Sequence, residues 1–420
     1  LRLEVRAMNT LVEFFVGTLF LVFRGGKKYY AWMASLALVA AVGMGAWVYQ
    51  LQHGLIITGM RDPVSWGLYI GNFTFLVGVA AAAVLLVIPA YIYKWGPIKE
   101  IVLLGELLAV AAICMCLMFV TFDLGHPERF WHLIPGLGIL NFPISMLAWD
   151  VVVLNVYLAI NLCVPVYILY SAYQDREPNH TILWPLILFS IPAAVSIHTV
   201  TAFLYNGFPS RPFWNASILA PRFIASAFCS GPSFIIIAFQ LIRRNTAIKI
   251  QDRAIFKLAE IVAYAMGINL FLLIAELFKE YYGGTVHLAP MQYLFEGLHG
   301  HNDLVPFIWT AQVFNLSAFL VFLIPKLREN FITLNVACVL VFIGVWIEKG
   351  MGLIVPGFVP SPLGEVWSYN VTMPEVLISA GIWAIGLMIY TLLLKVAIPI
   401  EVGEFRQIKD RLRGLSGSRG

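Results

Sequence analysis

Ten long apolar stretches dominate the pattern of hydrophobic and polar positions along the chain. They run over residues 30–52, 66–93, 98–122, 143–173, 181–204, 217–242, 255–280, 304–325, 329–355 and 374–398. A helix needs about 20 predominantly apolar residues to cross the hydrocarbon core of a bilayer. The pattern therefore predicts an all-α, polytopic membrane protein with ten transmembrane helices.

A further apolar stretch, residues 10–23, is short for a membrane span. We expect an interfacial helix there. It lacks a basic leader followed by a small-residue cleavage site, so we do not predict a signal peptide. The expected organisation is a cytoplasmic or interfacial N-terminal segment (1–29), a ten-helix membrane domain (30–399) and a cytoplasmic C-terminal tail (400–420).

Composition and charge agree with this assignment. The chain is 60% hydrophobic and 12% charged, with a mean hydropathy of +0.84, whereas soluble domains are about 25% charged. Most Lys and Arg fall on the N-terminal side of the ten spans; the exceptions are Arg61, Arg129, Arg211, Arg222, Lys279 and Lys349. Because cytoplasmic loops carry the excess of basic residues, both termini are predicted to be cytoplasmic. The net charge of +4 then reflects topology, and we expect no nucleic-acid partner.

The links on the opposite, outer side are longer than the cytoplasmic ones and rich in Pro, Gly, Trp and His. They cover residues 53–65, 123–142, 205–216, 281–303 and 356–373. Long structured loops often carry binding residues. The outer face is therefore predicted to be a docking surface or the roof of a site.

A short internal match suggests a repeat. Residues 104–109 (LGELLA) in the third span match residues 258–263 (LAEIVA) in the seventh. An offset of four spans gives a parallel repeat, as in transporters with two similar halves. Spans two to five and six to nine would then form two four-helix bundles, flanked by spans one and ten. The match pairs Glu106 with Glu260, for which a proton relay and a buried hydrogen-bonded acid are both open.

Metal-centred redox chemistry has little support in the sequence. The five cysteines lie within predicted spans and none has iron–sulfur or c-type haem spacing. Of the histidines, only His198 lies well inside a span, so we expect neither haem nor an iron–sulfur cluster on this chain. For His299 and His301 we favour a solvated loop over a metal site. Electrons would need a partner protein or an organic carrier.

The outer end of the third span carries four ionisable groups, from Asp123 to Arg129. Histidine changes protonation near neutral pH, and an acid beside it can set its tautomer. Asp123 and His126 are therefore candidates for proton transfer to a quinone oxygen. The alternative is an interfacial cap with Asp–Arg pairing.

Aromatic residues recur at helical spacing where the second span begins. Trp66 and Tyr69, with Asn72 nearby, can form a flat slot and hydrogen-bond donors for a ring-shaped ligand. The aromatic belt of the membrane interface is the alternative. It explains Trp66 at least as well.

Other polar residues lie within the predicted spans, where charges are costly and usually functional. Asp150 and Tyr157 share one face of the fourth span. Asp150 and His198 lie at a similar outer depth, about 10 Å into the membrane for Asp150 at 1.5 Å per residue. Glu276 and Glu348 are also in the outer half, as proton relays or structural ion-pair partners. Because adjacent residues on a helix do not face each other, we expect Lys349 to pair with Glu276.

Four segments resemble the NrfD/polysulfide-reductase family of membrane subunits. They are residues 64–73 (VSWGLYIGNF), 123–130 (DLGHPERF), 149–155 (WDVVVLN) and 346–353 (WIEKGMGL). The likeness covers roughly residues 30–400. It is greatest to the long, ten-helix branch that includes the DsrP subunit of the Dsr complexes of sulfur metabolism and the Hmc and HybB-type subunits.

This resemblance implies a cofactor-free, quinone-reactive subunit in a prokaryotic cytoplasmic membrane. Its partner would be a ferredoxin-like iron–sulfur protein on the outer face. In a Dsr-type complex, the further partners would be a multihaem cytochrome c, a haem-b membrane subunit and a cytoplasmic iron–sulfur subunit. The resemblance supplies no quinone ligand that maps onto single residues here.

The leading hypothesis is the quinone-reactive subunit of an oxidoreductase complex. Menaquinone or ubiquinone would bind near the outer ends of spans two to five, with Trp66, Tyr69, Asn72, Tyr157 and His198 around it. His126, Asp150 and Asp123 would handle protons, with relays through Glu106, Glu260, Glu276 and Glu348. The alternatives are an ion-coupled transporter and a structural anchor without a quinone site.

Overall fold

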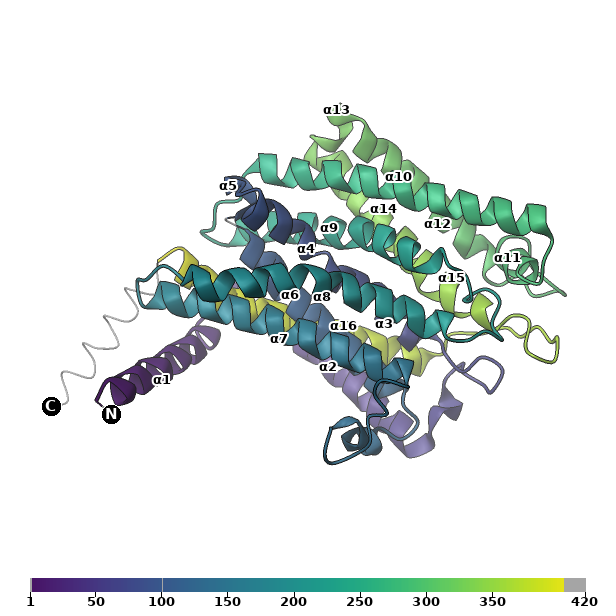
Figure 1. Cartoon of the computed structure of the whole chain (residues 1–420), viewed down its shortest axis with the longest axis horizontal. Coiled ribbons are helices and arrows are strands. Elements are labelled where there is room, and N and C mark those ends of the chain that lie inside the picture. Colours follow the sequence, from purple (N-terminus) through teal and green to yellow (C-terminus); the bar gives the residue numbers. More distant parts are fainter. Residues whose placement is uncertain (1, 100, 404–420) are drawn as a thin grey trace.

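The structure is a computed structural model that describes residues 2–99 and 101–403 (Figure 1). Its long helices are α1 (Arg2–Val22), α2 (Lys27–His53), α3 (Leu68–Ala81), α6 (Val102–Asp123), α7 (Met146–Tyr173), α8 (His180–Asn206), α9 (Leu219–Asn245), α10 (Asp252–Gly283), α12 (Val305–Leu323), α14 (Phe331–Lys349) and α16 (Met373–Glu401). The shorter helical segments are η1 (Leu55–Ile57), α4 (Val84–Val87), η2 (Ile88–Ile92), α5 (Gly96–Lys99), η3 (Pro127–Leu133), α11 (Leu288–Phe295), α13 (Pro325–Arg328), α15 (Met351–Ile354) and η4 (Pro356–Phe358).

The ten predicted spans are confirmed. Ten helices of the described chain are long and apolar enough to cross a membrane. Their ends differ by only a few residues from those read off the apolar pattern. The apolar stretch near the N-terminus belongs to α1, which is longer than predicted. Most of the predicted C-terminal tail, residues 404–420 with their basic side chains, lies outside the described residues.

The helices pack as the repeat predicted, in two four-helix bundles. In the first, α3, α6, α7 and α8 contact one another in turn; in the second, α9, α10, α12 and α14 do so. The two bundles meet where α9 packs against α3 and α8. Figure 1 shows all of these helices running roughly side by side. We call the end at which α2 begins and α16 ends the inner end, and the opposite end the outer end.

The flanking spans α2 and α16 pack closely against each other. A Cβ at Gly43 would lie 2.6 Å from the Cα of Gly381, so these two backbones approach too closely for any side chain between them. Small residues permit such contacts between membrane helices. α16 also packs against α6. The apolar window of α6 is 83% buried, whereas that of α2 is 17% buried. Polar groups on α3 and α6 therefore lie in the centre of the protein.

Asn72, predicted as a ligand-binding residue, joins three helices. Its Nδ2 donates to the Leu68 carbonyl at 2.8 Å. Its Oδ1 accepts from the indole Nε1 atoms of Trp346 on α14 and Trp383 on α16, each at 3.0 Å. With these three bonds, the side-chain amide is engaged in fixing the position of α3.

Replacing Asn72 with leucine is expected to destabilise the fold. It leaves two indole N–H groups without their acceptor, at a cost of about 1–3 kcal/mol for each if it stays buried. The measurement is the melting temperature of the detergent-solubilised protein. Asn155→Leu is the matched control, because Asn155 makes the same bond to the residue four positions earlier but is exposed. Equal melting temperatures for the two variants would contradict the role given to Asn72.

Candidate functional site

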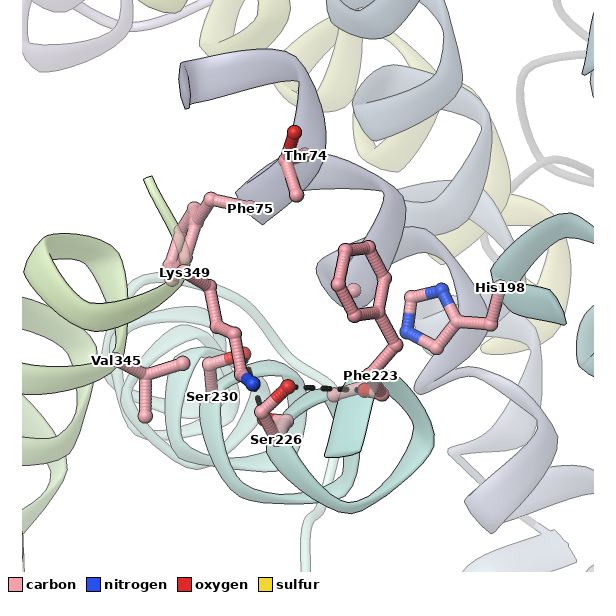
Figure 2. Close-up of a pocket in the computed structure, with 10 residues that line it drawn as sticks. Thr74, Phe75, His198, Phe223, Ser226, Ser230, Val345 and Lys349 are labelled. Atoms are coloured by element: carbon pink, nitrogen blue, oxygen red, sulfur yellow. Dashed lines mark hydrogen bonds between the residues drawn. The ribbon is translucent and has the colours of Figure 1, made fainter. Parts of the chain in front are cut away.

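A small polar cavity lies where the two bundles meet. Its lining includes Thr74 and Gly78 of α3, His198 of α8, Ser226 of α9 and Lys349 of α14 (Figure 2). Its volume is about 10 Å³, measured as the space open to the centre of a water molecule. That is room for about one water. The cavity therefore fits a hydrogen-bonded water and is too small for an aromatic ring.

His198 is the polar group of this cavity that most needs a partner. It is buried, and neither ring nitrogen has a hydrogen-bond partner among residues 2–99 and 101–403. Figure 2 shows the ring of Phe223 beside the imidazole, on the side toward Lys349. The ring centroids of His198 and Phe223 are 6.3 Å apart, and the Lys349 ammonium lies 5.6 Å from the Phe223 centroid. Buried polar groups are normally hydrogen-bonded, so a water bound in this cavity would be the natural partner of His198.

Asp150 of α7 contacts α8 about one helical turn from this histidine. The Thr201 hydroxyl, on the same helix as His198, is 2.7 Å from the Asp150 Oδ1 and also 2.7 Å from the Ile197 carbonyl. A hydroxyl has one proton and cannot donate to both oxygens. If Asp150 is protonated, it donates to Thr201 and Thr201 donates to Ile197, so that each hydroxyl proton has its own acceptor. The pair is thus arranged to hold a proton on Asp150 and to release it.

A buried ion cluster lies nearby in the second bundle. Arg222 of α9 donates through Nη1 to Glu276 of α10, and through Nη2 to Oε1 of Glu348 of α14 at 2.9 Å. Asn315 of α12 donates to the other Glu348 oxygen at 3.0 Å. The Lys349 ammonium lies 3.8 Å from Glu348. Two cations and two carboxylates thus balance, and the cluster ties together all four helices of the bundle.

The predicted pairing of Lys349 with Glu276 is wrong. Arg222 binds the carboxylates of both Glu276 and Glu348, because its planar guanidinium can donate to two acceptors at once. The sequence did contain a signal. Arg222 lies inside the predicted sixth span, at the same outer depth as the two acids.

A second hydrogen-bond network closes the outer end of the flanking helices. The hydroxyl of Tyr69 donates to Gln50 of α2 at 2.7 Å, and Gln50 donates to the Phe122 carbonyl at 2.8 Å. Asp123, next to Phe122, has a buried Oδ1 without a partner in the described part of the chain. Tyr69 therefore joins α3 to α2. Asp123 is the residue of this network whose carboxyl oxygen lacks a hydrogen-bond partner in the described part of the chain.

Glu375 caps α16 at this same end. Its carboxylate accepts from the backbone N–H groups of Thr372 at 2.9 Å and Gly59 at 2.8 Å, and from the hydroxyl of Tyr369. Burial, and then the neighbouring carboxylate, raises the pKa of Tyr369 well above its usual range. Sequence analysis missed this residue, although Thr372 and Glu375 form a capping box that the spacing reveals.

His126 lies apart from the buried groups. It stands on the outer surface just before η3 with a side chain 67% exposed, and its Nδ1 is 2.8 Å from Glu128. A backbone hydrogen bond, and then the imidazole, holds the pKa of Glu128 below its usual range. The acid beside His126 in the structure is Glu128 rather than Asp123.

The remaining aromatic candidates mainly pack. Trp66 contacts Tyr205 and Trp214, with ring centroids 5.9 and 5.5 Å apart. Tyr205 continues the polar layer, since its hydroxyl is 2.5 Å from that of Thr74 at the cavity. The Tyr157 hydroxyl donates to the Ala80 carbonyl at 3.4 Å and holds α7 against α3.

The two glutamates paired by the repeat have different surroundings. Glu106 is buried, and its Oε2 has no partner among the described residues. The Glu260 side chain is 26% exposed and lies 3.1 Å from Lys257 and 3.9 Å from Arg328. Their positions in the bundles match, but their chemistry differs.

Comparison with known proteins extends over most of the chain. The family described as Polysulphide reductase, NrfD matches residues 56–360. The chain belongs to the NrfD family. That match contains the cavity, the Asp150–Thr201 pair and the Arg222 cluster, whereas Gln50 and Glu375 fall outside it.

Individual relatives of this NrfD chain are membrane subunits. It is 28% identical over 262 residues to a putative dimethyl sulfoxide reductase membrane subunit of Halobacterium salinarum, covering 58% of this chain but only 59% of that protein. It is 24% identical to the Hdr-like menaquinol oxidoreductase integral membrane subunit of Archaeoglobus fulgidus, covering 79% and 80%. It is 22% identical to the menaquinone reductase integral membrane subunit of Nitratidesulfovibrio vulgaris, covering 77% and 80%.

No group of three or more His, Cys, Asp or Glu side chains within residues 2–99 and 101–403 could hold a metal ion. His301, one of the two loop histidines considered for metal binding, has its Nδ1 2.6 Å from the Ser368 hydroxyl. Its neighbour His299 is exposed.

Proposed function

We propose that the chain is the quinone-interacting integral membrane subunit of a multi-subunit respiratory oxidoreductase. It would exchange electrons between menaquinone or ubiquinone and a partner iron–sulfur subunit. Family membership supports this, as do the two relatives whose names specify menaquinol or menaquinone. The observation that carries the proposal is a set of two buried protonatable groups in the outer half of the membrane domain. His198 lines a water-sized cavity, and Asp150 is hydrogen-bonded to Thr201 on the same helix as His198.

The chemistry assigns separate tasks to the chain and its partner. Oxidation of a quinol releases two protons and two electrons. The electrons pass to the partner's iron–sulfur centre. The protons need acceptors within the membrane domain, and Asp150 can accept one through Thr201 while the cavity water carries another to His198. In the reverse direction, the same groups supply the protons that a quinone takes up.

The cavity is too small to hold the ring itself. We place the ring further out, toward the outer ends of α3, α6, α7 and α8, beside the aromatic side chains around Trp66. There Asp123, whose buried oxygen has no partner within residues 2–99 and 101–403, completes the set of proton-handling groups. His126 serves at the surface, where protons leave to or arrive from the outer solution.

Further inward, Glu106 is the strongest candidate for a proton relay, because one oxygen of its buried carboxyl has no partner among the described residues. Glu260 would connect the relay to solution at the inner surface, because its side chain is partly exposed there beside Lys257. Glu276 and Glu348 hold Arg222, so their role in a relay would require that ion cluster to rearrange.

We place both termini in the cytoplasm of a prokaryote and the outer face on the opposite side. The link around η3 supports a docking surface there, because it exposes apolar side chains at Phe130, Trp131, Ile139 and Ile144. A ferredoxin-like iron–sulfur subunit would cover it. Membership of a Dsr-type complex of sulfur metabolism adds a multihaem cytochrome c, a haem-b membrane subunit and a cytoplasmic iron–sulfur subunit as further partners.

The decisive experiment purifies the chain from its native membrane and follows electron flow. We expect iron–sulfur subunits to copurify, and added quinol to reduce their clusters in a reaction blocked by quinone analogues. Ion flux through the chain alone in liposomes would support a transporter instead. A complex that transfers electrons without binding a quinone analogue would leave only an anchoring role.

Replacing His198 with leucine separates a structural role from a functional one. Because the imidazole has no protein hydrogen bond among the described residues, the melting temperature should stay unchanged or rise. Quinol-dependent reduction of the partner should nevertheless fall at least about tenfold, since positioned acid–base groups contribute about 10²–10⁴. His180→Leu, exposed on the same helix, should leave both quantities unchanged. A stable His198→Leu variant with full turnover would remove His198 from the proton route.

A further inference from the structure

Two grooves of similar size open at the inner end of the protein. The first, of about 740 Å³, lies between the last turn of α9, the link 246–251 and the start of α14. The second, of about 750 Å³, lies between η2, the start of α10 and α13. Both grooves lie at the inner end of the protein, where basic residues are in excess. That general excess therefore does not explain a difference in charge between the two grooves.

Their charges differ. The first groove is lined by Arg243, Arg244 and Lys249, with no acidic residue in its lining. The second is lined by three basic residues and three acidic ones: Arg253, Lys257, Arg328, Asp252, Glu260 and Glu329. The second groove balances its own charge, whereas the first presents an excess of positive charge.

Within the first groove, the cations have distinct tasks. Arg243 pairs with Asp252 just outside the lining, and its guanidinium lies 4.6 Å over the ring of Phe331. Arg243 is therefore already engaged by neighbouring side chains and forms part of the groove wall. Arg244 and Lys249 are exposed, and neither forms an ion pair within the described chain. These two cations remain available to an anion from outside.

The walls beside these cations are apolar and face outward. Leu241 lines the groove and is 57% exposed. Ile332 and Val336, next to the lining residues of α14, are 77% and 54% exposed. A soluble anion gains nothing from such surfaces, but a lipid covers them with its acyl chains. Basic pockets between membrane helices recognise anionic headgroups in this way.

We propose that the first groove binds an anionic phospholipid. The phosphate of the headgroup lies between Arg244 and Lys249, and the acyl chains run along Leu241 and the exposed face of α14 toward the middle of the membrane. The bound lipid fills the space between the two bundle helices α9 and α14. This proposal does not depend on the quinone chemistry.

The test is native mass spectrometry of the detergent-purified full chain with added phosphatidylglycerol or phosphatidylcholine. We expect selective binding of phosphatidylglycerol. A basic residue near the headgroup strengthens binding about fivefold, so Arg244→Gln with Lys249→Gln should weaken it by about 25-fold. Arg253→Gln with Lys257→Gln removes the same charge from the second groove and should leave binding unchanged.

Three results would overturn the proposal. They are unchanged binding in the first double variant, equal weakening in both double variants, and displacement of the lipid by soluble glycerol phosphate at similar concentration. The last would identify a site for free phosphate esters. Melting temperatures of both variants confirm that each is folded before its binding is compared.

Discussion

Arg222→Met is expected to be the most destabilising single change in this chain. It leaves Glu276 and Glu348 buried without their shared cation, and the remaining ammonium of Lys349 is 3.8 Å from Glu348 only. Removing one partner of a buried ion pair costs about 3–5 kcal/mol. We expect little folded protein after detergent extraction and a markedly lower melting temperature in what remains.

Two controls make this expectation specific. Arg211→Met removes another outer arginine, one that stacks on Phe358 and donates to its carbonyl, and it should have a much smaller effect. Combining Arg222→Met with Glu276→Gln removes one cation and one carboxylate and leaves Lys349 beside Glu348, so it should restore most of the stability. If Arg222→Met melts at the same temperature as Arg211→Met, the cluster does not stabilise the bundle.

Asp150→Asn is expected to have the largest effect on activity. The asparagine amide can still hydrogen-bond the Thr201 hydroxyl, so the local packing survives, but the side chain can no longer bind and release a proton. A positioned acid–base group contributes about 10²–10⁴ in rate. The rate of quinol-dependent reduction of the partner, measured at saturating quinol, should fall within that range.

Thr201→Val is the companion variant, because it removes the hydroxyl between Asp150 and Ile197 and leaves the carboxyl in place. It should slow the reaction less than Asp150→Asn. Reduction of the partner by a soluble chemical reductant should be the same in both variants and in the parent protein. Full quinol turnover by Asp150→Asn would exclude this carboxyl from the mechanism.

Helix positions were predictable because burial of apolar side chains in lipid depends on length and composition alone. The same pattern placed Asp150, His198, Glu276 and Glu348 in the outer half of the membrane. It even suggested two bundles from one six-residue match. Depth, however, is a coordinate along the helix, and it says nothing about which neighbour a side chain faces.

Rotation and packing decided the partners. Asn72 was predicted as a ligand-binding residue, yet it accepts from indoles 274 and 311 positions away. Glu106 and Glu260 occupy matching places in the repeat, but one is buried and the other lies beside a lysine at the surface. Such differences arise from neighbouring helices that no local pattern encodes.

The sequence by itself determined the ten spans, the NrfD resemblance and the set of costly charges inside the membrane. Only the tertiary structure decided that Arg222 holds two of those acids, that His198 faces a cavity with room for one water, and that Thr201 links Asp150 to the backbone. The physical reason is that hydrophobic burial is nondirectional and sums along the chain. Hydrogen bonds and ion pairs need defined distances and angles between helices that are far apart in sequence.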